Sequence, residues 1–288
     1  MLKHRVLSGF SMGGALLAAL YFLPPEGAII LVALLCGISI LEFYALLEQG
    51  GMKAQKWTGV AGSLALLVLG WLHVYFAGDA NTELELMVIF VTLAVVMIRQ
   101  MFLGDIASAA RSIAATMLGV LYIGILFHFM SKLLLYAGMA DGRWHEGRWL
   151  FFYLALVVKL TDVGAYFTGC RLGGRKFFPS ISPAKTWSGV LGGMATGMVC
   201  SLAGWSLMQG NMIHVQLTWV DALALGLLLS AAGITGDLIE SMLKRACGVK
   251  DSGTVIKGMG GVLDVVDSLI FAAPVLYIYL NLFAPVLP

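Results

Sequence analysis

Two carboxylates stand three residues apart in the last polar stretch of the chain, "GMGGVLDVVDS" from Gly258 to Ser268. Asp264 and Asp267 of this stretch precede a long apolar run that ends the sequence. An ionised carboxylate near the centre of a membrane helix costs about 2.5–3.5 kcal/mol. The pair therefore indicates either a functional site or two charges that a cation masks.

A second polar set lies about twenty residues earlier. It places four side chains at positions i, i+3, i+4 and i+7: Asp237, Glu240, Ser241 and Lys244. A helix brings such positions onto one stripe that faces a common partner. Carboxylates that converge at a membrane surface need cations, and hard oxygen ligands with room for phosphate oxygens suit Mg²⁺. Three cations would complete a phosphate clamp: Lys244, Arg245 and Lys250.

A third set begins within the apolar run near residue 160 and continues after it. Lys159 and Asp162 are three residues apart, so a helix lets them neutralise one another, either as part of a site or only as a packing ion pair. Downstream, "SPAKTW" predicts a helix start with Ser182 as N-cap, followed by Lys185 and Thr186 in the first turn. A helix N-terminus with hydroxyls and a lysine is suited to bind an anion.

The elements that must position these residues are membrane helices. The chain has 288 residues, of which 60% are hydrophobic and 12% charged, with a mean hydropathy of +0.91. Soluble domains carry about 45–50% apolar and about 25% charged residues. The four cysteines are scattered singly, which indicates neither a disulfide framework nor a zinc site. The sequence therefore predicts an all-α, polytopic membrane protein.

Apolar runs of about 20 residues predict about nine spans. They lie near residues 6–23, 28–48, 57–77, 84–98, 112–137, 149–169, 186–208, 217–243 and 262–284. Lysine and arginine gather in alternate connecting segments, which places the N-terminus in the cytoplasm and the C-terminus outside. We expect residues 1–148 to be packing and lipid-facing helices, and residues 149–288 to carry a catalytic site at the cytoplasmic face.

At these motifs the chain resembles the phosphatidate cytidylyltransferases, also called CDP-diacylglycerol synthases. Residues that match the family's C-terminal signature at its spacing are Ser241, Lys244, Arg245, Lys250, Asp251, Gly253, Ile256, Gly260, Gly261, Val262, Asp264 and Asp267. The stretches "TDVGAYFTG" and "SPAKTWSG" resemble two upstream motifs of the family, so the likeness spans roughly residues 150–275.

Several positions depart from the family pattern. Lys257 stands where Pro or Gly is usual, Met259 replaces a His, and Val265 replaces an Arg. Upstream, Ala184 and Ser188 differ from the more frequent Lys and Glu. Because the predicted metal-binding carboxylates are present, we expect a divergent but active enzyme.

The resemblance implies transfer of CMP from CTP to phosphatidate, with CDP-diacylglycerol and pyrophosphate as products. It implies catalytic roles for Asp237, Asp264, Asp267 and Lys244, with the three aspartates as ligands of Mg²⁺ and a second cation left open. The residues expected to bind or shape the substrate site are Asp162, Ser182, Lys185, Thr186, Ser241, Arg245, Lys250, Asp251, Gly260 and Gly261.

The expected partners are CTP, phosphatidate or a related lipid phosphate, and membrane lipids, with no nucleic acid. A homodimer is left open, and the expected location is the bacterial inner membrane. Three alternatives remain at this point: a cytidylyltransferase or CTP-dependent kinase for another lipid, a non-catalytic homologue that acts as a membrane partner, and a transporter. The clustering of polar groups at one membrane face, away from the midplane, disfavours the transporter.

Overall fold

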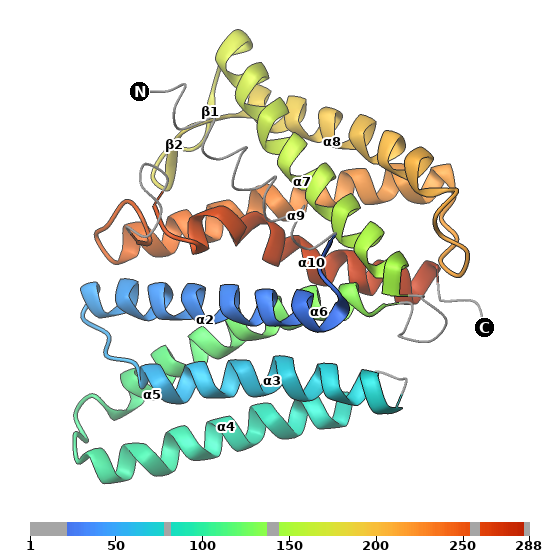
Figure 1. Cartoon of the computed structure of the whole chain (residues 1–288). Coiled ribbons are helices and arrows are strands. Elements are labelled where there is room, and N and C mark those ends of the chain that lie inside the picture. Colours follow the sequence, from blue (N-terminus) through green and yellow to red (C-terminus); the bar gives the residue numbers. More distant parts are fainter. Residues whose placement is uncertain (1–21, 78–81, 137–143, 254–259, 285–288) are drawn as a thin grey trace. The chain divides into compact units, whose positions relative to one another are not determined.

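The computed structural model describes residues 22–77, 82–136, 144–253 and 260–284 (Figure 1). Within these ranges, eight helices are long and apolar enough to cross a membrane. Helices satisfy their own backbone hydrogen bonds, which is why they form wherever the chain must lie in lipid. The prediction of an all-α membrane protein is confirmed. The first of the nine predicted spans, near residues 6–23, falls almost wholly outside the described residues.

A short β-hairpin interrupts the succession of helices along the chain. The elements, in chain order, are α2 (Pro25–Gln49), α3 (Lys56–Ala77), α4 (Thr82–Leu103), α5 (Ala109–Gly119), η1 (Val120–Gly124), α6 (Ile125–Leu134), α7 (Trp144–Leu172), β1 (Lys176–Phe178), β2 (Ser182–Thr186), α8 (Trp187–Met208), α9 (Trp219–Ala246) and α10 (Leu263–Phe283). The π-helical turn η1 joins α5 and α6 into one apolar span of 26 residues.

The chain forms two compact units. The first contains Met1–Lys132 and Lys244–Val266, and the second contains Leu133–Leu243 and Asp267–Pro288. Helices α9 and α10 each begin in one unit and end in the other. The functional division expected after residue 148 stays a prediction, because these units divide the chain by compactness alone.

In the first unit, α2 is fixed to α5 by buried polar contacts. The Tyr44 hydroxyl donates a 2.7 Å hydrogen bond to the Thr116 carbonyl, and its ring lies against Gly59 and Gly119. The side chain of Gln55, which follows α2, donates to the Val96 carbonyl at 2.9 Å. Helix α2 also carries a buried carboxylate, Glu42.

In the second unit, α7 and α8 pack closely through small residues. Gly189 and Gly193 on α8 face Ala165 on α7, and a Cβ atom at either glycine would come closer than 3.0 Å to atoms of α7. Close approach of backbones through small residues is a common way for membrane helices to associate. The packing brings the polar residues of α7 near the start of α8.

The start of α8 differs from the prediction. Ser182 to Thr186 form β2, which pairs antiparallel with β1, and the helix begins only at Trp187. Thr186, instead of Ser182, caps the helix by accepting a 3.2 Å hydrogen bond from the Gly189 amide. The hairpin is held by packing of Phe177 and Ile181 against a buried cluster of Val190, Ile234 and Leu238.

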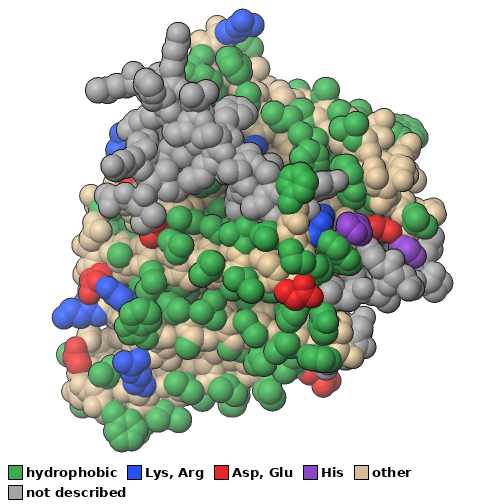
Figure 2. All heavy atoms as spheres, viewed as in Figure 1, with side chains coloured by type: hydrophobic (Ala, Val, Ile, Leu, Met, Phe, Trp, Pro, Cys, Tyr) green, Lys and Arg blue, Asp and Glu red, His purple; other side chains and the backbone are tan. Residues whose placement is uncertain are grey.

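Large apolar side chains cover the outer surface of α3 and α4 in the first unit. Figure 2 shows them spread over these helices, whereas charged side chains lie towards the helix ends. On α4 the exposed ones include Leu86, Met87, Phe90, Val91, Val95, Met97, Ile98, Met101 and Phe102. Such a continuous apolar surface is suited to lipid chains.

The two ends of α8 test the predicted orientation. This helix has 22 residues and is therefore about 33 Å long, enough for a hydrocarbon core of about 30 Å. In a variant whose native cysteines are replaced, we expect Ser180→Cys to react with a membrane-impermeant thiol reagent only from the cytoplasmic side. Gly210→Cys, beyond the other end, should react only from outside. Reaction of both from one side would show that α8 does not span the membrane.

Candidate functional site

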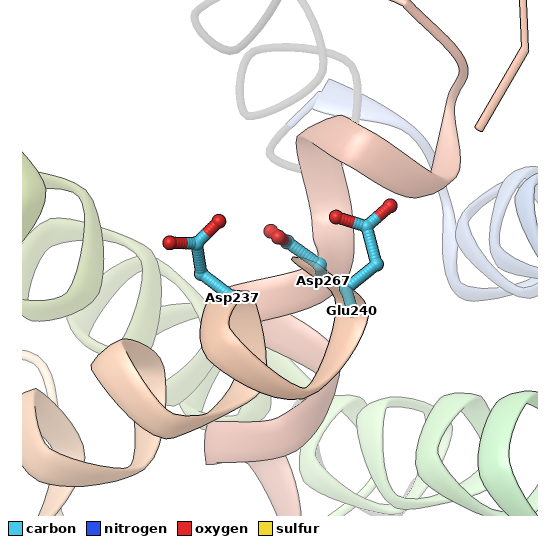
Figure 3. Close-up of side chains that lie close together, drawn as sticks. All are labelled: Asp237, Glu240 and Asp267. Carbon is cyan, nitrogen blue, oxygen red and sulfur yellow. The ribbon is translucent and has the colours of Figure 1, made fainter. Parts of the chain in front are cut away.

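Three carboxylates of the second unit come together from two helices. Asp237 and Glu240 on α9 and Asp267 on α10 each offer an oxygen atom, and these atoms lie within 4.8 Å of one another (Figure 3). Asp237 is partly exposed, whereas Glu240 is 1% and Asp267 4% exposed. The stripe predicted along α9 thus forms a carboxylate cluster with the aspartate predicted on α10.

Lysines from two other elements compensate this negative charge. Lys185 on β2 forms an ion pair with Asp237, and the side chains are 26% and 34% exposed. Lys159 on α7 donates a 3.1 Å hydrogen bond to Ser268 and interacts electrostatically with Asp267. The predicted residues from three separate motifs therefore meet in one place.

Asp162, predicted to neutralise Lys159, lies one turn further along α7. Its charge interacts with those of Lys159, Asp237 and Lys185. Asp162 thus adds a fourth carboxylate to the surroundings of the cluster. The "SPAKT" stretch contains two further predicted site residues, Ser182 and Thr186. Ser182 begins β2, and Thr186 is buried as the cap of α8.

The donor set of this cluster fits a hard divalent cation. Mg²⁺ prefers oxygen ligands and is commonly held by one or two carboxylates together with substrate phosphates. Asp237, Glu240 and Asp267 supply only carboxylate oxygens, at a spacing that one ion can bridge. Glu240 was predicted to lie on the stripe but not to bind metal. Helical spacing indicates which residues share a face, but it does not indicate which of them bind the ion.

Asp264 belongs to a different arrangement, in the first unit. Its Oδ1 atom accepts a hydrogen bond of 2.5 Å from Lys244, which is itself buried. Its Oδ2 atom accepts from the Ser252 amide at 3.0 Å, the Ser252 hydroxyl at 2.7 Å and the Gly261 amide at 2.8 Å. Asp264 therefore holds Ser252 and Gly261 against the first turn of α10, and its role as a metal ligand stays a prediction.

The glycines before α10 are required by this arrangement. Gly260 adopts a φ of +103°, and a Cβ atom there would collide with the Asp264 carboxylate. At Gly261 an added Cβ atom would collide with the carboxylate of Glu42 and the hydroxyl of Ser252. The backbone thus passes directly over two carboxylates, which only glycine permits.

Sequence reasoning missed the role of Glu42. This buried residue of α2 accepts hydrogen bonds from the amides of Val262 at 3.0 Å and Leu263 at 2.8 Å. The sequence shows Glu42 only as a single carboxylate within an apolar span, and this pattern does not indicate which residues it contacts. The interaction joins residues that are more than 200 positions apart.

The remaining predicted site residues lie around the end of α9. Arg245, Lys250 and Asp251 are exposed, and Ser241 is partly exposed. Arg245 donates a 3.2 Å hydrogen bond to the Val249 carbonyl, which closes the turn after the helix. Of the departures from the family pattern, Val265 lies in the first turn of α10, whereas Lys257 and Met259 fall outside the described residues. Substrate contacts of this group stay predictions.

Comparison with known proteins places the chain in a class. A sequence model of the cytidylyltransferase family matches residues 3–283, and the chain therefore belongs to that family. It is 32% identical to the phosphatidate cytidylyltransferase of Bacillus subtilis over 290 residues, which cover 98% of this chain and 99% of that protein. It is 31% identical to the Staphylococcus haemolyticus phosphatidate cytidylyltransferase over 268 residues, covering 92% and 96%. A third relative, the uncharacterized protein YnbB of Escherichia coli, is 34% identical over 201 residues, covering 68% of this chain and 64% of that protein.

A glycine substitution tests the loop before α10. We expect Gly261→Ala to lower the free energy of unfolding by about 1–3 kcal/mol, the usual cost of forcing an extra methyl group into a packed site. The measurement is the shift of the unfolding midpoint in detergent. Gly37→Ala on α2 is the matched control, because nothing lies within 4 Å of a Cβ atom added there. Equal effects of the two substitutions would contradict the close approach at Gly261.

Proposed function

We propose that this enzyme transfers CMP from CTP to phosphatidate, giving CDP-diacylglycerol and pyrophosphate. The observation that carries the proposal is the match of almost the whole chain to the cytidylyltransferase family, together with its full-length likeness to two bacterial phosphatidate cytidylyltransferases. The carboxylate cluster supports it, because a polyphosphate substrate is commonly bound through Mg²⁺ and carboxylates.

In this reaction a phosphate oxygen of the lipid attacks the α-phosphorus of CTP, and the bond from that phosphorus to the bridging oxygen breaks. The lipid phosphate is already anionic near neutral pH, so no general base is required. Mg²⁺, when bound, neutralises charge on the triphosphate and on the departing pyrophosphate. We assign the holding of this ion to Asp237, Glu240 and Asp267.

The cations of the chain would bind and orient the phosphates. Lys185 is already at the cluster and partly exposed, so its ammonium group can turn from Asp237 towards a phosphate. Lys244, Arg245 and Lys250 are proposed to hold further phosphate oxygens from the end of α9 and the loop after it. Asp264 would keep Lys244 in place through their ion pair, and its own role as a metal ligand stays a prediction.

The bacterial relatives and the apolar helices favour a multi-pass protein of the bacterial inner membrane. The site would face the cytosol, where CTP is made, and would open sideways to lipid so that the acyl chains stay in the bilayer.

The direct test is incubation of the purified protein with labelled CTP, Mg²⁺ and phosphatidate. A labelled CDP-lipid and stoichiometric pyrophosphate are expected. Parallel reactions with an isoprenoid phosphate and with diacylglycerol distinguish a cytidylyltransferase for another lipid and a CTP-dependent kinase. Absence of product from every lipid would favour the non-catalytic homologue.

Removal of a cluster carboxylate should remove activity. Since loss even of residues that only support metal ligands costs about 10–100-fold, we expect Asp267→Asn to lower turnover by at least about 100-fold. Asp105→Asn, at an exposed residue between α4 and α5, is the control and should leave turnover unchanged. Near-normal turnover of a folded Asp267→Asn protein at low Mg²⁺ would exclude the metal role of this residue.

Lys185 should compete with metal for Asp237. We therefore expect Lys185→Met to tighten Mn²⁺ binding in the absence of CTP by up to about fivefold, the equivalent of a partly exposed ion pair of about 0.2–1 kcal/mol. The same variant should bind CTP more weakly. The measurement is an electron paramagnetic resonance titration of free Mn²⁺, with the exposed Lys176→Met as control. Unchanged or weaker Mn²⁺ binding would show that the ammonium group of Lys185 does not compete with the metal ion for Asp237.

A further inference from the structure

The carboxylate of Glu42 lies against the N-terminus of α10. Its Oε1 atom accepts the amide hydrogen of Val262, and its Oε2 atom accepts that of Leu263, at 3.0 and 2.8 Å. The first amides of a helix have no partner within the helix, and the helix dipole favours a negative charge at this end. Glu42 therefore caps α10 from a distant helix, through both of its oxygen atoms.

Asp264 also binds the same turn. The Gly261 amide donates to the Asp264 Oδ2 atom, and the next two amides donate to Glu42. Three consecutive amides are thus shared between two carboxylates. Movement of the turn away from Glu42 would displace the Gly261 amide, and with it one of the contacts that orient Asp264.

Packing leaves this carboxylate little freedom. Glu42 is 8% exposed, and Gly253 and Gly261 both pass so close to it that a Cβ atom at either position would collide with its carboxylate group. A residue with both oxygens engaged and almost no exposed surface is not available to bind substrate. Its influence on the reaction must act through the turn.

We propose that Glu42 is a positioning residue for CMP transfer. It fixes the turn from Gly260 to Leu263 and thereby the orientation of Asp264 and its partner Lys244. Helix α2 then has a role within the first unit beyond packing and contact with lipid, because it orients Asp264 and Lys244. This inference rests on the proposed function.

The test compares Glu42→Gln with Glu48→Gln. Glutamine keeps the size of the side chain, but its NH₂ group cannot accept the second amide hydrogen. Glu48 lies on the same helix and pairs with Lys56 at the surface, so its variant is the matched control. We expect Glu42→Gln to speed amide hydrogen exchange in residues 260–266 about ten- to hundredfold, the range for loss of a hydrogen bond to a charged group. Exchange in α8 should not change.

Kinetics supply the second readout. Per folded molecule, Glu42→Gln should lower kcat at least about tenfold and raise the Mg²⁺ concentration for half-maximal rate, with the KM for phosphatidate unchanged. Glu42→Asp keeps the charge but is one methylene shorter, and should recover part of the loss. A purely structural role would reduce only the folded fraction and leave the Mg²⁺ dependence unchanged.

The outcomes separate the two proposals. Unchanged exchange in residues 260–266, or faster exchange in every helix alike, would overturn the positioning role of Glu42. So would normal kcat and Mg²⁺ dependence in the folded variant. If the wild-type protein made no CDP-lipid, the proposed function and the catalytic part of this inference would fall together, whereas the exchange experiment would still decide whether Glu42 holds the turn.

Discussion

The need to neutralise carboxylates inside apolar helices governs this structure. Each such charge costs about 2.5–3.5 kcal/mol at the centre of a membrane span unless a partner compensates it. Three carboxylates of the described residues illustrate how this is done. Asp264 forms an ion pair with Lys244, and Glu42 accepts hydrogen bonds from the first amides of α10. Glu85 on α4 pairs with both His128 and Lys132 of α6. The cluster of Asp237, Glu240 and Asp267 concentrates more negative charge than these arrangements, which is the property expected of a site that takes up a cation.

A small hairpin supplies one of the compensating charges. Lys185 reaches Asp237 from β2, and the strand is held by apolar packing of Phe177 and Ile181. If α8 began at Pro183, Lys185 would follow the helix path and its position would depend on the helix register. In the structure Lys185 instead lies on an extended strand, whose hairpin packs against both α8 and α9.

The sequence alone predicted those features that depend on the local pattern of residues. Apolar runs predicted about nine spans, and eight of these coincide with the long apolar helices of the described residues. The spacing of three residues predicted that Asp237 and Glu240 share a face of a helix. The N-cap at Ser182 was wrong because "SPAKT" is compatible with a helix start locally, whereas packing against residues near position 235 favours the strand. The contact of Glu42 with α10 could not be predicted, since nothing in either segment specifies a partner about 220 residues away.

The link between Glu42 and α10 also has a consequence for biogenesis. Glu42 is synthesised early, whereas Val262 and Leu263 emerge about 220 residues later. At about 5–20 residues per second, about 10–45 s pass before the amides that will receive this carboxylate exist. During that time α2 resides in the membrane with an acidic group that lacks its final partners, so the proton equilibrium of Glu42 and its depth in the bilayer become part of the folding pathway. Completion of the last helix would then act as the step that locks the early helices into their functional arrangement.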